Sequence, residues 1–126
     1  MHENPLSEAI VDAAYKIHVS LGPGLLESVY EVVLAHDLKR RGLQVERQVP
    51  VPIVYDGITF EEAYRIDLLV ERKVIVEVKS VETVTAIHKK QLLTYLKLMD
   101  KRLGLLINFN EELIKSGITR TANGLA

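Results

Sequence analysis

The first forty residues carry apolar positions at the spacing of two helices. From about Pro5 to Leu21 the apolar residues recur every three or four positions, which predicts a helix with one buried stripe. Asn4 is expected to cap it and Gly22-Pro23-Gly24 to end it. A second helix is predicted from about Leu25 to Arg41, closed by Gly42. The expected buried faces are Leu6, Ile10, Ala13, Ala14, Ile17 and Leu21 in the first helix, and Leu26, Val29, Tyr30, Val33, Leu34 and Leu38 in the second.

The pattern then changes to the two-residue period of strands. Gln44 to Tyr55 and Ile58 to Val70 are predicted to form a hairpin around Asp56-Gly57, and Val74 to Lys79 a third strand. Two prolines in the first of these strands place it at a sheet edge or give it a bulge. The residues expected to share one face of that strand are Val45, Val49, Val51, Ile53 and Tyr55.

The C-terminal third returns to a helix and a strand. About Thr85 to Asp100 has helical spacing, and Arg102 to Phe109 is a continuous apolar run typical of a strand buried on both faces. A short helix is predicted from Glu111 to Lys115, and the last ten residues are weakly patterned. Because a strand joined through a helix to the next strand usually pairs with it in parallel, we expect a mixed α/β sheet. It would contain helices, a three-strand antiparallel meander, a helix and a fourth, parallel strand.

Composition narrows the class of protein. A chain of 126 residues predicts one domain, residues 1–126, and the absence of cysteine excludes disulfides, thiolate catalysis and cysteine-based zinc sites. The N-terminus lacks a signal-peptide pattern, and no apolar run approaches the roughly 20 residues of a membrane span. We therefore expect a cytoplasmic protein with no membrane contact. The net charge of −1 is a mild argument against tight, non-specific nucleic-acid binding.

Three charged residues stand at the ends of two neighbouring predicted strands. Glu77 and Lys79 are two residues apart and therefore point to the same side of their strand. Asp67 joins them if the two strands pair. Two carboxylates and an ammonium group are costly to bury without a purpose, and holding a divalent metal ion is such a purpose. A solvent-facing Glu–Lys pair has the same spacing, so the residues alone leave both interpretations open. The opposite face of the Asp67 strand is expected to hold Ile66, Leu68 and Val70.

Two further motifs flank this set. Gly24-Leu25-Leu26-Glu27-Ser28-Val29-Tyr30 precedes it, and Gln91-Leu92-Leu93-Thr94-Tyr95 follows it. Together with Asp67 and Glu77-Val78-Lys79, they make the chain resemble the PD-(D/E)xK nuclease superfamily, in the branch with a Gln-x-x-x-Tyr motif. The resemblance is to the small GxxExxY proteins in particular, and it spans about Ile10 to Leu125. One departure is that an isoleucine precedes Asp67, where the superfamily name has proline.

The resemblance implies a restriction-endonuclease-like core and a hydrolase that cuts DNA or RNA phosphodiester bonds with Mg²⁺ or Mn²⁺. It implies that Asp67 and Glu77 bind the ion together with the Val78 main-chain carbonyl. Glu27 would contribute directly or through water. We expect Lys79 to orient the attacking water and to stabilise charge in the transition state. The resemblance also implies a catalytic set, which comprises Glu27, Asp67, Glu77, Lys79, Gln91 and Tyr95.

Gln91 is expected to orient the water or a phosphate oxygen, and Tyr95 to support the site. These two residues lie one helical turn apart and share a face, and a surface glutamine with a core tyrosine is the alternative interpretation. Glu27 lies in the first turn of its helix, where the dipole favours any acid, and Glu31 one turn later is an alternative to it.

A non-catalytic nucleic-acid-binding or assembly module that keeps the nuclease fold is the alternative function. A third option is a nuclease that works as a homodimer, or with a partner subunit that supplies the grip on nucleic acid. Lysines and one arginine in the C-terminal half form either a phosphate-facing track or a solvated face; they are Lys89, Lys90, Lys97, Lys101 and Arg102.

Overall fold

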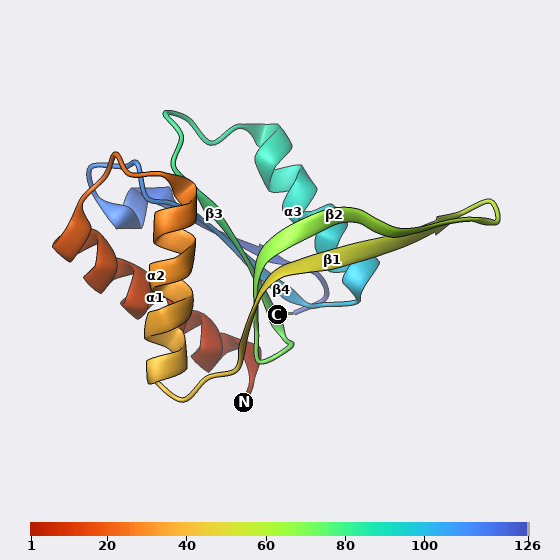
Figure 1. Ribbon diagram of the computed structural model, residues 1–126, viewed down its shortest axis with the longest axis horizontal. Helices are drawn as coiled ribbons and strands as arrows, with labels where there is room; N and C mark the ends of the chain where they lie inside the picture. Colours follow the sequence, from red (N-terminus) through yellow and green to blue (C-terminus); the bar gives the residue numbers. More distant parts are fainter. Residues whose placement is uncertain (126) are drawn as a thin grey trace.

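The computed structural model describes residues 1–125, and residue 126, the last of the predicted domain, lies outside the described residues. Helices α1 (Glu3–Leu21) and α2 (Glu27–Arg40) open the chain and lie side by side (Figure 1). The remaining elements are β1 (Val45–Tyr55), β2 (Ile58–Val70), β3 (Val74–Lys79), α3 (Ala86–Met99), β4 (Leu103–Asn108), the 3-10 turn η1 (Ile114–Gly117) and β5 (Ile118–Ala122).

The strands form one mixed sheet in the order β1-β2-β3-β4-β5. β3 pairs in parallel with β4, and every other pair is antiparallel, so the predicted meander and parallel crossover are confirmed. β1 is an edge strand, as its prolines predicted, and its pairing with β2 is irregular between Val51 and Ile53. β5 was not predicted, because its residues are half-buried or exposed at the other edge and carry little apolar signal. The helix predicted at Glu111–Lys115 is instead the single turn η1, three residues later.

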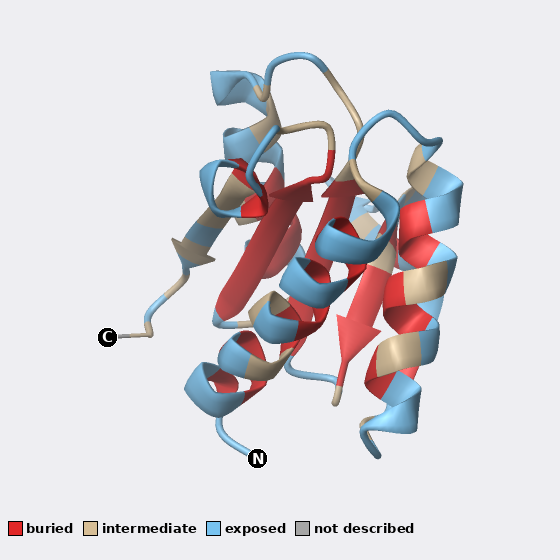
Figure 2. Cartoon of the chain, turned by 90° about the vertical axis from the view of Figure 1, so that its left-hand side faces the viewer, coloured by how far each residue is buried: buried red, intermediate tan, exposed pale blue. Residues whose placement is uncertain are grey.

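Helices cover both faces of the sheet and bury its central strands. One apolar cluster joins α1 and α2 to Val74, Val76 and Val78 of β3. A second cluster joins α3 to Ile75 and to residues of β1, β2 and β4. In Figure 2 the central strands are buried along their length, while the helices show exposed outer faces. The alternation within β3 therefore has the predicted consequence: its valines face one layer, and Ile75 and Glu77 face away from them.

The ends of α1 and α2 differ from the prediction. The N-cap of α1 is His2, whose Nδ1 accepts a hydrogen bond from the Asn4 amide at 3.1 Å. Asn4 is therefore not the cap, and Pro5 lies within the first turn, where a missing N–H leaves no helical bond unmade. Three apolar residues predicted to be buried are exposed, because they lie at the joined ends of the two helices, away from the sheet. They are Leu21, Leu26 and Val29.

The apolar residues of β1 and β2 change from one face of the sheet to the other at the point where Gln48 lies opposite Asp67. The pairing skips these two residues, and Gln48 adopts a left-handed φ of 53°. On one side of this point Val45, Leu68 and Val70 pack against α1 and α2, whereas on the other side Val49, Val51 and Ile66 pack against α3. The predictions that Ile66 shares a face with Leu68, and Val45 with Val49, are therefore wrong. A single left-handed residue rotates the ribbon, and the apolar alternation does not reveal it.

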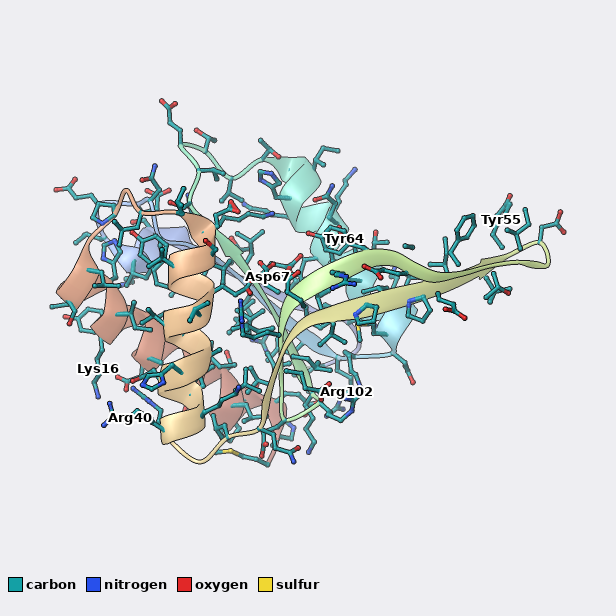
Figure 3. All side chains as sticks on the ribbon, in the orientation of Figure 1. Lys16, Arg40, Tyr55, Tyr64, Asp67 and Arg102 are labelled. Atoms are coloured by element: carbon teal, nitrogen blue, oxygen red, sulfur yellow. The ribbon has the colours of Figure 1, made fainter. Side chains whose placement is uncertain are left out.

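Beyond the exchange point, β1 and β2 continue as a two-stranded arm that leaves the body of the protein, with Tyr55 near its tip (Figures 1 and 3). The turn at Asp56-Gly57 has φ values of 48° and 78°, the left-handed pair of the predicted tight hairpin. Tyr55 pairs with Ile58, and both side chains are more than half exposed. Within residues 1–125, no helix is long and apolar enough to cross a membrane.

The arm tip is expected to contribute little to global stability. The double variant Tyr55→Ser/Ile58→Thr should change the free energy of unfolding by less than about 0.5 kcal/mol, because these side chains bury little surface against the body. Leu69→Ala, at a fully buried position of the same hairpin, should cost about 2–5 kcal/mol. Chemical denaturation of the three proteins checks this, and a large loss in the arm variant would show that the tip supports the core.

Candidate active site

Asp67 and Glu77 are tied together at the point where β2 and β3 separate. The Glu77 carboxylate accepts a hydrogen bond from the Asp67 amide at 2.8 Å, and the Asp67 carboxylate accepts one from the Val78 amide at 2.7 Å. Regular pairing of the two strands begins only at Leu68 and Val76. Each carboxylate thus takes the place of a backbone acceptor in the ladder. The predicted convergence of the two acids is what the structure has, and Figure 3 shows Asp67 at the base of the arm, beside α2.

The two acids are held in a setting that disfavours their charged forms. Burial, together with the nearby charge of Asp67, raises the pKa of Glu77 to about 8. Burial, together with the charge of Glu31, raises the pKa of Asp67 to about 6. Lys79, at the end of β3, acts in the opposite direction on the Glu77 pKa but does not cancel the burial. Such a pair favours protons or a cation.

Glu31 lies beside this pair but is already neutralised by β1. Its side chain is almost fully buried, and its Oε2 accepts hydrogen bonds from Nε and an Nη of Arg47 at 3.1 and 2.8 Å. Its Oε1 accepts one from the Gln48 amide at 2.8 Å, and the same amide nitrogen lies 3.4 Å from Oδ1 of Asp67. Both oxygens of Glu31 are therefore engaged, so it is less available as a ligand than Glu27.

Glu27 begins α2 on a loop that Tyr30 fastens. The fully buried Tyr30 donates its hydroxyl to the Gly22 carbonyl at 2.6 Å and accepts the Leu25 amide at 3.1 Å. Glu27 Oε1 accepts a hydrogen bond from the Ser80 amide at 3.3 Å, which places it next to the end of β3. Glycine, glutamate and tyrosine of the first motif thus have a shared structural role. The loop turns at the glycines, the tyrosine holds it, and the glutamate reaches β3.

The motif on α3 places one residue at the site and leaves the other at the surface. Tyr95 is buried and stacks face to face on Tyr64 of β2, with ring centroids 4.3 Å apart. The pKa of Tyr64 is raised by burial and by the charge of Glu77, so this stack borders the acid pair on the α3 side. Gln91 is exposed one turn earlier. His88, in the first turn of this helix, closes a capping box with Thr85.

The donor chemistry fits a hard divalent cation only in part. Asp67 and Glu77 each use one oxygen for a backbone amide, which leaves the second oxygen directed to other partners. Within residues 1–125, however, no group of three or more acids or histidines is close enough to form a complete ion site. Glu27 is nearby through Ser80 but does not complete a trio. A cation would therefore rest on two carboxylates, with water, main-chain oxygen and substrate filling the remaining positions.

Sequence reasoning missed the residues that hold these acids. Gln48, Arg47 and Tyr64 surround the pair, and only the fold brings them there. A left-handed glutamine inside a strand has no sequence signal. Arg102, included in the predicted basic track, instead binds Glu3 through two hydrogen bonds of 3.0 Å.

Comparison with known proteins gives one match that covers most of the chain. The family model described as the PD-(D/E)XK nuclease superfamily matches residues 4–121. No curated protein and no solved structure matches. The mixed five-stranded sheet, with β3 parallel to β4 and helices on both faces, agrees with the restriction-endonuclease-like fold of that superfamily.

Removing the Glu77 charge should stabilise the protein at neutral and alkaline pH. Between pH 4.5, the ordinary glutamate value, and about 8, the folded protein keeps a proton that the unfolded chain releases, so stability falls as pH rises. Without divalent metal at pH 8, Glu77→Gln should gain about 1–3 kcal/mol over the wild type, and the difference should vanish near pH 4.5. Denaturation from pH 4.5 to 8 measures it, with the exposed Glu112→Gln as control. A wild type that gains stability relative to Glu77→Gln across this range would contradict the expectation.

The left-handed backbone at Gln48 gives a second test. Gln48→Gly and Gln48→Ala both lose the amide bonds to Glu31 and Asp67, but only alanine keeps a Cβ at φ 53°. Gln48→Gly should therefore be more stable than Gln48→Ala by about 1 kcal/mol. At Glu46, an exposed position of the same strand with ordinary backbone, the order should reverse. The same order at both positions would mean that the strand at Gln48 relaxes to a regular form.

Proposed function

Because the chain belongs to the PD-(D/E)XK nuclease superfamily, we propose that it is a single-domain, metal-dependent nuclease that hydrolyses phosphodiester bonds of DNA or RNA. The observation that carries the proposal is the pair of the half-buried Asp67 and the buried Glu77, whose pKa values are raised and which each use only one oxygen in the ladder. Burial side by side disfavours the charged forms of both acids and so costs free energy at neutral pH. Their retention is explained if they meet a cation during function.

Asp67 and Glu77 would hold Mg²⁺ or Mn²⁺, assisted by the Val78 main-chain oxygen and by Glu27 directly or through water. When bound, the ion would supply Lewis acidity to the scissile phosphate and to the attacking water. The stacked Tyr64 and Tyr95 beside the pair keep the local dielectric low, which would strengthen the attraction between the carboxylates and the ion.

The remaining motif residues act on the water and the phosphate. The Lys79 ammonium, close enough to influence the Glu77 pKa, orients the attacking water and stabilises the negative charge that develops on the phosphoryl oxygens. Gln91 is exposed on α3 and positions the water or a phosphate oxygen. Tyr95, fixed by its stack on Tyr64, keeps α3 at the correct distance from β2 and β3.

We also assign the chain to the GxxExxY proteins and to the branch with the Gln-x-x-x-Tyr motif. The first assignment is supported by the joint role of Gly24, Glu27 and Tyr30 in bringing a carboxylate to the end of β3. The second is supported by the burial of Tyr95 beside the acid pair. Nucleic acid is the proposed substrate. Lys89 and Lys90, exposed near the start of α3, are available to its phosphates.

A cleavage assay with Mg²⁺ or Mn²⁺ on single- and double-stranded DNA and RNA tests the proposal. Asp67→Asn and Lys79→Ala should each lower the rate by at least about 100-fold, because one removes a ligand and the other removes charge stabilisation in the transition state. Mg²⁺ should also raise the thermal unfolding temperature of the wild type but not of Asp67→Asn. Lys16→Ala, at an exposed position on α1, is the control for preparation and charge. Equal cleavage by all four proteins would assign the activity to a contaminant and defeat the proposal.

A further inference from the structure

A groove of about 600 Å³ opens beside the proposed catalytic centre, and of the residues that line it only Glu27 takes part in the chemistry described above. Its residues come from the Gly24–Val29 segment on one side, and from Ser80 and Asn110 on the other. Glu27 lines its inner end, and Ser80 directly follows Lys79. The groove therefore begins where the proposed catalytic residues end. Its volume lies within the roughly 300–1,000 Å³ typical of small-molecule sites.

Both walls of the groove are fastened from below. Tyr30 holds the first wall through Gly22 and Leu25, and its ring stacks on Phe109 with centroids 4.4 Å apart. The fully buried Asn108 holds the second wall, because its side chain bonds both backbone groups of Val81 and the Asn110 amide. The Ser80 hydroxyl donates to the Leu25 carbonyl at 2.6 Å and joins the two walls. The groove is thus a built feature, not a gap between mobile loops.

The surface of this rigid groove is apolar where the fold does not require it. Leu25 is 41% exposed and Leu26 is 74% exposed, although neither supports the core. Leu26 occupies the N-cap of α2 without a side-chain capping bond, at a position where serine, threonine or aspartate is favoured. An exposed leucine there forms no capping hydrogen bond and leaves its apolar surface in water. Both features are unfavourable for the protein alone, and both are explained if that surface receives a ligand.

We propose that this groove binds a nucleobase of the nucleotide next to the scissile phosphate, an inference that rests on the proposed nuclease function. Leucine and valine side chains offer a flat apolar surface to the face of a base. Asn110, half-buried at the rim, offers an amide to its polar edge. The only charged residue of the lining is the acid Glu27, which excludes the phosphate backbone from the groove itself. The phosphate instead lies inward, toward Asp67, Glu77 and Lys79.

The identity of the ligand follows from the position of the groove next to the proposed catalytic centre. Glu27 belongs to both the groove and the proposed ion site, so the groove adjoins that site. A phosphodiester held there would therefore direct one of its two nucleosides toward Leu26 and the other away from it. Because the groove is open to solvent, it accepts a base from a single strand or from an unpaired end. A paired base in a continuous duplex is stacked on both faces and has none free for the leucines.

The test uses the full chain labelled with ¹⁵N, titrated with the thymidine dinucleotide d(TpT) in Mg²⁺, and in parallel with dimethyl phosphate, which has no base. The dinucleotide should shift the resonances of Leu25, Leu26 and the Asn110 side chain, and dimethyl phosphate should leave them in place. Leu26→Ser and Asn110→Ala should weaken dinucleotide binding about tenfold, in the range found when base stacking is removed. Serine is a favoured N-cap, so the first variant is expected to fold. Val19→Ser, which removes an exposed apolar side chain from α1, is the matched control.

The outcomes separate this proposal from the function on which it rests. Dinucleotide shifts confined to the acid pair, with unchanged affinity in both groove variants, would overturn the base site while leaving the nuclease intact. Groove shifts without cleavage of any nucleic acid would support the base site and count against catalysis. Equal shifts from dimethyl phosphate, or no shifts in the groove, would also overturn it.

Discussion

The exchange of backbone for carboxylate hydrogen bonds between Asp67 and the Glu77–Val78 peptide is the constraint on which the site depends. β2 and β3 part beyond Leu68 and Val76, and parting strands leave buried amides without acceptors. The two carboxylates supply those acceptors, at 2.7 and 2.8 Å, and so end the ladder without orphaned donors. The same bonds fix the position of each acid to its neighbouring strand. The same two hydrogen bonds therefore both end the pairing of β2 with β3 and orient the acids.

This arrangement sets stability against function in one place. Burial raises the pKa of both acids, and Glu31 adds a third carboxylate, which forms an ion pair with Arg47 and accepts a hydrogen bond from the Gln48 side chain. Gln48 in turn holds a left-handed conformation that a non-glycine residue adopts only at a cost in free energy. The left-handed residue and the charges surround the point where β2 and β3 separate, while the central strands β3 and β4 are packed with aliphatic side chains on both faces. Concentrated strain of this kind is expected where a protein reserves a site for a ligand.

The sequence predicted the elements well because their signals are local. Helical spacing, the Asp56-Gly57 turn and the apolar run of β4 each depend on a few neighbouring residues, and the order of elements then determined the parallel pairing of β3 with β4. The convergence of Asp67 and Glu77 was also predictable, since two paired strands bring opposite residues together. The exchange of faces at Gln48 was not, because the apolar alternation in the sequence continues through it unbroken and only the face to which it points changes. β5 was missed for a related reason: an edge strand with exposed residues has no apolar period to detect.

The weak point of the sequence interpretation was the absence of anything that holds nucleic acid, and the fold changes how that absence is understood. A net charge of −1 argues against a broad positively charged surface. Arg102, the last residue of the predicted basic track, is paired with Glu3. Affinity that does not come from phosphates must come from bases. The first motif, with Tyr30 beneath it, holds apolar side chains at the surface next to Glu27, where such contacts would act on the nucleotide being cut. A small, nearly neutral nuclease of this construction would bind its substrate weakly and locally, and would favour strands whose bases are already unpaired.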